Sequence, residues 1–195
     1  MSNSNVCGET RRGGTMPRTE IRIAGFGGQG VVLSGVLLGR AAVLHGGRYA
    51  IQTQTYGAAA RGGAARSDVI IDDAPIVYPQ VTHPDIMTAF TNQALGKYID
   101  DLRPDAVLII DSGLVHPPEG TSFDIHGIPA TNIAVDSFGR SIVANMVMLG
   151  YMTALTGIIG RDALESAIRE GVPKGTEDLN LTAFAKGFEL ARNGG

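Results

Sequence analysis

The segment with the clearest chemical potential is a run of glycines, Gly25-Phe26-Gly27-Gly28-Gln29-Gly30. It fits the pattern G-x-G-x-x-G and stands between a strand-like stretch, Glu20–Gly25, and a small apolar helix-like stretch, Val31–Leu44. Glycines let the backbone turn tightly and approach a ligand, and the free N–H groups at the start of a helix favour an anion. We therefore predict a cofactor-binding loop whose contacts are Gly25, Gly27, Gly28, Gln29 and Gly30.

This loop lacks the second part of a dinucleotide site. An acidic residue about 20 positions downstream normally holds the ribose hydroxyls. That window, Ala50–Gln54, contains no acid, so ordinary NAD binding is disfavoured, and Arg48 is only a marginal partner for an NADP phosphate. A purely structural role, in which the glycines let helix and strand pack closely, is the alternative.

A second glycine-rich segment follows, Thr55-Tyr56-Gly57-Ala58-Ala59-Ala60-Arg61-Gly62-Gly63. An arginine beside exposed backbone amides suits a phosphate or a carboxylate, and ligands bind at loops that follow the strands of such sheets. We add Tyr56, Arg61, Gly62 and Gly63 to the predicted cofactor-binding residues. The alternative is a flexible connection that carries an ordinary surface arginine.

Charge is distributed unevenly along the chain, whose formal net charge is −3. Residues 21–67 contain no Asp or Glu, yet they include five arginines. Such a stretch suits an anionic ligand or an acidic partner surface. The competing interpretation is that acids from the second half of the chain pair with these arginines, which are Arg22, Arg40, Arg48, Arg61 and Arg66.

Other catalytic chemistry is not evident. The single cysteine, Cys7, excludes an internal disulfide and an iron–sulfur cluster held by this chain alone. Ser34 and Ser112 lack the Gly-x-Ser-x-Gly elbow of hydrolases, and the four histidines show no metal-ligand spacing. We therefore predict no catalytic residue and no metal site in this chain. Scarce aromatic residues and the absence of Trp argue against binding of single-stranded nucleic acid.

The 195 residues suffice for one domain, with 44% hydrophobic residues to build a core. Strands and helices alternate, which predicts one α/β domain with a largely parallel sheet flanked by helices. We expect further strands at Arg48–Thr55, Arg66–Asp72, Pro75–Tyr78, Ala106–Asp111, Thr121–Ile125 and Ile128–Ile133. We expect further helices at Thr91–Leu102, Ser141–Leu155, Arg161–Glu170 and Thr176–Ala191.

Two segments bear on localisation. Residues 1–18 are polar and rich in Gly and Arg, without the apolar centre of a secretory signal, so we expect a disordered leader. Ser141–Gly160 has no charged residue over 20 positions, but its glycines, threonines and asparagine favour a buried or interfacial helix over a membrane span. We expect a cytoplasmic protein.

The motifs together resemble the γ subunit of 2-oxoacid:ferredoxin oxidoreductases, most closely the 2-oxoglutarate branch. The resemblance extends over residues 19–191, predicting one Rossmann-like domain of this γ type over 19–195. In this chain Ala58 and Ala59 replace the Pro-Glu that often follows Tyr-Gly in the family. The matching residues are G-x-G-G-Q-G at Gly25–Gly30, T-Y-G-x-x-x-R-G-G at Thr55–Gly63, Ser67–Ile71, Pro79, Asp85, Ile128–Thr131, Asn145–Gly150, Leu179–Leu181, Ala183-Phe184 and Lys186-Gly187.

The resemblance implies a role within a complex. Such complexes decarboxylate a 2-oxoacid, transfer the acyl group to coenzyme A and pass electrons to ferredoxin, using thiamine diphosphate, Mg and iron–sulfur clusters held by other subunits. The implied partners are α and β subunits, with a δ subunit in some complexes, and ferredoxin through the complex; neither nucleic acid nor membrane is implied. Coenzyme A would lie against Gly25–Gly30 and Arg61–Gly63.

Alternatives remain open at this point. A complex specific for pyruvate or indolepyruvate would carry similar motifs, because substrate choice is expected in the other subunits. A free-standing Rossmann enzyme using NADP, or a nucleotide- or coenzyme-A-binding module without partners, would also account for the glycine loops.

Overall fold

The computed structural model describes residues 18–56 and 64–194, in which six strands form one sheet. The order across the sheet is β2-β3-β1-β4-β5-β6, with β3 antiparallel to both of its neighbours and the other pairs parallel. The predicted α/β fold with a largely parallel sheet is confirmed. The strands are β1 (Thr19–Phe26), β2 (Tyr49–Thr55), β3 (Ala64–Asp72), β4 (Ile86–Ala89), β5 (Val107–Asp111) and β6 (Asp124–Ile128).

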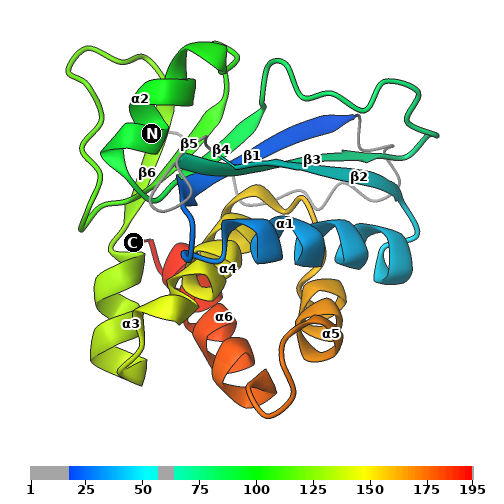
Figure 1. The fold of residues 1–195 in the computed structure, drawn as a ribbon, viewed down its shortest axis with the longest axis vertical. Coiled ribbons are helices and arrows are strands. Elements are labelled where there is room, and N and C mark those ends of the chain that lie inside the picture. The colour runs from blue at the N-terminus through cyan, green and yellow to red at the C-terminus, as the bar shows by residue number, and fades with distance from the viewer. Residues whose placement is uncertain (1–17, 57–63, 195) are drawn as a thin grey trace, which may run out of the picture.

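Helices cover the two faces of the sheet unequally. Figure 1 shows α1, α3, α4, α5 and α6 below the sheet and α2 alone above it. The helices are α1 (Val31–Arg40), α2 (Asn92–Tyr98), α3 (Ala130–Phe138), α4 (Ala144–Thr156), α5 (Arg161–Gly171) and α6 (Glu177–Arg192). Short 3-10 or π-helical turns extend them at Ala41–His45, Ile99–Asp101 and Ser141–Val143.

The centre of the five-helix face is α4, which has no polar side. Ten consecutive residues, from Ala144 to Thr153, are buried, as its uncharged sequence predicts. It packs closely on α6, where a Cβ at Gly150 would lie 2.0 Å from the Phe184 carbonyl oxygen and one at Gly187 would lie 1.9 Å from the Val147 carbonyl oxygen. Two glycines therefore let the backbones of α4 and α6 touch.

Several sequence predictions for the middle of the chain are wrong. Pro75–Tyr78 forms no strand, and the Tyr78 carbonyl accepts a hydrogen bond from Arg18 Nη1 at 3.0 Å. Ile128–Ile133 is not a strand either: Ile128 ends β6 and Pro129 precedes α3. The strand expected at Thr121–Ile125 begins only at Asp124, and the buried strand β4 was not predicted at all.

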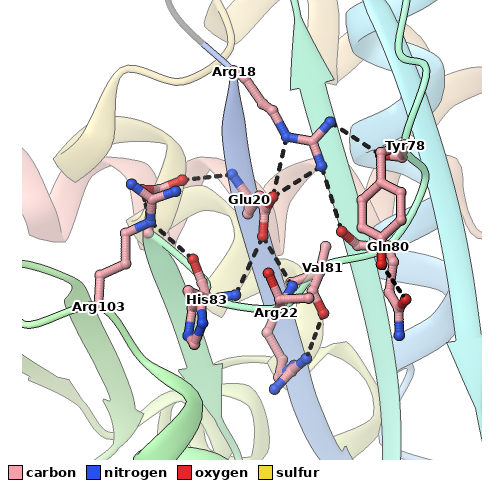
Figure 2. Close-up of polar contacts among 10 residues, drawn as sticks. Arg18, Glu20, Arg22, Tyr78, Gln80, Val81, His83 and Arg103 are labelled. Carbon is pink, nitrogen blue, oxygen red and sulfur yellow. Dashed lines mark hydrogen bonds and ion pairs between the residues drawn. The ribbon is translucent and has the colours of Figure 1, made fainter.

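At the amino end of β1, the buried carboxylate of Glu20 binds the segment that precedes β4, as Figure 2 shows. Its Oε1 accepts from Arg18 Nε at 3.1 Å and Nη2 at 2.9 Å, and its Oε2 accepts from the amides of Thr82 at 3.1 Å and His83 at 3.4 Å. The Glu20 amide donates to Asp85 Oδ2 at 2.7 Å. The segment that leads into β4 is thus held against the start of β1.

Two residues after Glu20 on β1, the Arg22 guanidinium is almost completely buried, with 1% of the residue exposed. It donates to both oxygens of Asp68, at 2.8 Å and 3.2 Å, and to Asp101, and it lies 5.1 Å from the ring centroid of Tyr98. Burial alone would lower the pKa of Arg22, but the hydrogen bonds to and charges of these two carboxylates raise the pKa above its usual value. Arg22 therefore stays charged and joins β1, β3 and the turn after α2.

None of the helices in the two described ranges is both long and apolar enough to cross a membrane. The Ser141–Leu155 stretch divides into a 3-10 turn and α4, and α4 is buried within the domain. The predicted leader, residues 1–18, lies outside the described residues except for Arg18, so its disorder remains a prediction.

Candidate functional site

The candidate site lies where the chain changes direction across the sheet. From β1 the chain passes through α1 to β2 on one side, whereas β4 pairs with the other side of β1. The connections that leave the carboxyl ends of β1 and β4 therefore run to opposite sides of the sheet, and such a point leaves a crevice for ligands. In Figure 1 the arrow of β1 points to the left, where the chain turns down into α1.

The glycine loop occupies this edge as a tight turn. The amide of Gln29 donates to the Phe26 carbonyl at 3.2 Å, and the Phe26 amide donates to Gln29 Oε1 at 2.7 Å. Gly28 and Gly30 adopt positive φ angles of 95° and 71°, a conformation that costs other residues about 1–2 kcal/mol. The Gln29 side chain thus stabilises the turn by accepting from the Phe26 amide. Gly25 lies in β1 and is buried.

The turn leaves several backbone donors free. Among the described residues, none accepts a hydrogen bond from the amides of Gly27, Gly28 or Gly30. Gly27 and Gly28 are exposed, and a Cβ added at either would meet no atom within 4 Å. The start of α1 adds its positive dipole end, with no capping side chain and no acid in its first turn. The loop can therefore hold an anionic group such as a phosphate.

Residues of α1 and α4 hold the loop in place through hydrogen bonds to the Gly30 carbonyl. The Gly30 carbonyl accepts from the Ser34 amide at 2.9 Å, from Ser34 Oγ at 3.1 Å and from Asn145 Nδ2 at 3.3 Å. A Cβ at Gly30 would lie 2.2 Å from Asn145 Nδ2, so only glycine permits this approach. Asn145, buried at the start of α4, was among the residues that carried the family resemblance, but nothing in the sequence placed it at the loop.

A hollow of about 220 Å³ opens beside the loop. This volume is below the roughly 300–1,000 Å³ of a complete small-molecule pocket. The sequence analysis did not predict the residues that line it with Gly28 and Gln29, because they come from five separate places: just after β4, the loop after β5, α3, the 3-10 turn before α4 and the start of α4. They are Phe90, Leu114, Thr131, Ser141, Ile142 and Ala144.

The second glycine-rich segment begins at the same edge of the sheet. Ala64, the first residue of β3, pairs with Phe26 at the end of β1, and Tyr56 follows the end of β2 with 62% of its surface exposed. Arg61, Gly62 and Gly63 lie outside the described residues. Their role in binding therefore remains a prediction from the sequence, and the flanking strands bring the two ends of the segment to the edge that carries the glycine loop.

The arginines of the acid-free stretch do not form a common anion site. Arg22 pairs with Asp68 and Asp101; the other three described ones also pair with acids from residues 68–195, the part of the chain that follows this stretch. The interpretation that favoured such pairing is thus correct for all four. The partners are Glu170 for Arg40 at 3.6 Å, Asp73 for Arg48 at 2.6 Å and Asp68 for Arg66 at 3.4 Å.

Comparison with known proteins identifies the family. The model for pyruvate ferredoxin/flavodoxin oxidoreductase matches residues 20–190. The chain belongs to this family. It is 49% identical over 177 residues to the 2-oxoglutarate synthase subunit KorC of Methanocaldococcus jannaschii, a match that covers 90% of this chain and 95% of that protein.

Two solved structures of the family share the fold. The γ subunit of a keto/oxoacid ferredoxin oxidoreductase from Geobacter sulfurreducens superposes with a TM-score of 0.80 at 41% identity, covering 90% of this chain and 99% of that one. The 2-oxoglutarate:ferredoxin oxidoreductase of Magnetococcus marinus, solved with 2-oxoglutarate, coenzyme A and succinyl-CoA bound, gives 0.82 at 25% identity. The match covers 91% of this chain but 32% of that chain, so the same unit occurs both alone and as part of a longer polypeptide in the pyruvate ferredoxin/flavodoxin oxidoreductase family.

Within the described residues of this family member, no group of three or more His, Cys, Asp or Glu side chains could hold a metal ion. Among residues 18–56 and 64–194 we therefore identify no set of ligands for an iron–sulfur cluster, and we assign no redox step to these residues.

Proposed function

We propose that the chain is the γ subunit of a 2-oxoglutarate:ferredoxin oxidoreductase complex. The reaction converts 2-oxoglutarate and coenzyme A to succinyl-CoA and CO2 and passes two electrons to ferredoxin. The observation that carries this proposal is the 49% identity, over nearly the whole of both chains, to a 2-oxoglutarate synthase subunit. The incomplete hollow at the glycine loop supports a subunit whose site other chains complete.

Thiamine diphosphate, Mg and the iron–sulfur clusters belong to the other subunits in this proposal. The partners are α and β subunits, with δ in complexes that have it, and ferredoxin binds the assembled complex. The domain spans residues 19–195 and acts in the cytoplasm. This chain contributes no catalytic residue; it contributes a wall of the coenzyme A site.

The coenzyme A site is proposed at the glycine loop. The diphosphate of coenzyme A needs hydrogen-bond donors and positive potential, which the free amides of Gly27, Gly28 and Gly30 and the start of α1 offer. Gly25 and Gln29 shape the turn. From the sequence, Tyr56, Arg61, Gly62 and Gly63 complete this set, and replacing Arg61 with Ala should raise the apparent KM for coenzyme A. An unchanged KM would remove Arg61 from the site.

The subunit role is tested by anaerobic purification of the tagged chain from its native cells. We expect a brown complex of larger subunits that reduces viologen only when 2-oxoglutarate and coenzyme A are both supplied. Pyruvate and indolepyruvate are assayed in parallel, because activity with either in place of 2-oxoglutarate would reassign the substrate. A colourless chain that elutes alone would contradict the proposal.

A further inference from the structure

Asp111, the last residue of β5, is a buried carboxylate to which the proposed function gives no role. None of its surface is exposed, and none of the ion pairs among residues 18–56 and 64–194 includes it. Burial of a charge is costly unless hydrogen bonds compensate for it. The hydrogen bonds of Asp111 therefore show which segments depend on this residue.

The Asp111 carboxylate binds the start of α3. Its Oδ2 accepts from the Thr131 amide at 3.0 Å and from the Thr131 hydroxyl, and its Oδ1 accepts from the Gly113 amide at 3.4 Å. Pro129, at the N-cap position of α3, provides no capping hydrogen bond, so Asp111 supplies an acceptor for one of the amides that a helix start leaves free. Its negative charge also suits the positive end of the helix dipole.

The main chain of Asp111 fixes the loop after β5. Its carbonyl accepts from the Leu114 amide at 2.9 Å, and the Leu114 carbonyl accepts in turn from Asn92 Nδ2 on α2, at 3.3 Å. Thr131 and Leu114 both line the hollow beside the glycine loop, whereas Asp111 does not. A residue outside the hollow thus binds two of the residues that form its wall.

Packing gives these two segments little support of their own. Of the nine residues of α3, only Ala130 and Ala134 are buried, and Figure 1 shows this helix at the outer side of the helical layer. Leu114 leaves 42% of its surface exposed. Because the burial of apolar area is small at both segments, their positions depend more strongly on the hydrogen bonds to Asp111.

We propose that Asp111 is a positioning residue for the coenzyme A site, which holds Thr131 and Leu114 at the hollow so that a ligand beside Gly28 meets a formed wall. The inference rests on the coenzyme A site proposed above. Asp111 is fully buried and cannot itself contact the ligand. It should therefore affect the binding of coenzyme A and not the chemistry, which the other subunits perform.

The test is steady-state kinetics of the purified complex that carries Asp111→Ala. We expect the KM for coenzyme A to rise about tenfold, with kcat and the KM for 2-oxoglutarate retained. Glu20→Ala is the matched control, because Glu20 is another buried carboxylate that accepts from backbone amides, at the opposite end of the sheet. The control should lower the free energy of unfolding and leave the KM for coenzyme A unchanged.

Two variants keep the side-chain volume in case Asp111→Ala does not assemble. Asp111→Asn loses the charge and one acceptor oxygen, and Thr131→Val loses the hydroxyl that donates to Asp111; each should raise the KM for coenzyme A about threefold. Thr131→Ser keeps the hydroxyl and should restore the wild-type value. Where Asp111→Ala assembles, adding Thr131→Val to it should raise the KM no further, because the hydroxyl has already lost its acceptor.

The outcomes separate this inference from the proposed site. Unchanged KM values for coenzyme A in the Asp111 and Thr131 variants, with a raised value in Gly27→Ala, would overturn the role of Asp111 alone. Unchanged values in all of these variants would overturn the coenzyme A site as well. An equal rise in the Glu20→Ala control would show a general effect of destabilisation and would also overturn the role of Asp111.

Discussion

The two ends of β1 differ in whether their polar groups are paired within the described part of the chain. At the amino end, the carboxylate of Glu20 accepts four hydrogen bonds and the Arg22 guanidinium is surrounded by Asp68 and Asp101. At the carboxyl end, the amides of Gly27, Gly28 and Gly30 find no acceptor among the described residues. The amino end of β1 pairs its polar groups within the chain, whereas the carboxyl end leaves these amides available to a ligand.

The difference indicates how one strand can serve both stability and binding. Buried polar groups are costly unless they are paired, so the amino end holds the fold together and should tolerate substitution poorly. Exposed amides have no such requirement, because water serves them until a ligand replaces it. Substitutions at the first end should therefore change the free energy of unfolding, and substitutions on the open surface of the second should change binding.

The largest expected loss of stability is for Arg22→Met. The substitution leaves Asp68 buried, with 4% of its surface exposed, without its bidentate partner, and removing one partner of a buried pair costs about 3–5 kcal/mol. Urea unfolding followed by circular dichroism measures this change. A loss below about 1 kcal/mol would show that Arg66, 3.4 Å from Asp68, is sufficient on its own.

Gly30→Ala should cost about 2–4 kcal/mol, because it combines a left-handed backbone with crowding against Asn145. Gly28→Ala is the matched control: its φ is also positive, but its surroundings are open, so only the backbone cost of about 1–2 kcal/mol applies. The same urea titration compares the two variants. Equal losses would mean that the contact between the loop and α4 does not constrain Gly30.

Glu20→Gln should destabilise the chain by about 1–3 kcal/mol, since the amide replaces an acceptor oxygen that faces the amides of Thr82 and His83 or the Arg18 guanidinium. Hydrogen exchange should increase in the segment from Thr82 to Asp85, and the KM of the complex for coenzyme A should not change. A raised KM would mean that the two ends of β1 are coupled.

The smallest effect is expected for Arg161→Met on α5. Its ion pair with Glu165, 2.6 Å between Nε and Oε1, is partly exposed and links residues four apart on a helix. Its guanidinium also lies 4.9 Å from the Phe188 ring centroid, so the loss should be about 1 kcal/mol. Comparison of its urea midpoint with that of Arg22→Met separates surface ion pairs from buried ones. A cost similar to that of Arg22→Met would contradict the importance given to burial.

The sequence predicted the carboxyl end of β1 well, and it predicted α5 and α6 to within one residue of their bounds. The order of strand, glycine turn and helix over Glu20–Leu44 is local, and the structure has it, with α1 ending at Arg40 and a π-helical turn following. Strand β4 has only four residues and no alternation, and α3 begins with Ala130 and Thr131, where a strand was expected. Thr131 instead donates its amide to Asp111 at 3.0 Å, a contact 20 residues distant.

The candidate site shows the same limit. Its glycines could be identified because their pattern is local, whereas Asn145 contacts Gly30 across 115 positions of the chain. The lining from Phe90, Leu114 and Ile142 also depends on how the sheet is ordered. Pairing of Arg22 with Asp101 and of Arg40 with Glu170 was left open by the sequence for the same reason, because these acidic partners lie far along the chain.

The central claim, that the carboxyl end of β1 binds the diphosphate of coenzyme A, is tested most directly by Gly27→Ala in the purified complex. The added methyl group points into open space and should leave the urea midpoint unchanged, but it stands where the ligand would approach the free amides. We predict a rise in the KM for coenzyme A of about tenfold, equivalent to about 1.4 kcal/mol, with kcat and the KM for 2-oxoglutarate retained. An unchanged KM for coenzyme A in a stable, active complex would contradict the assignment of this loop.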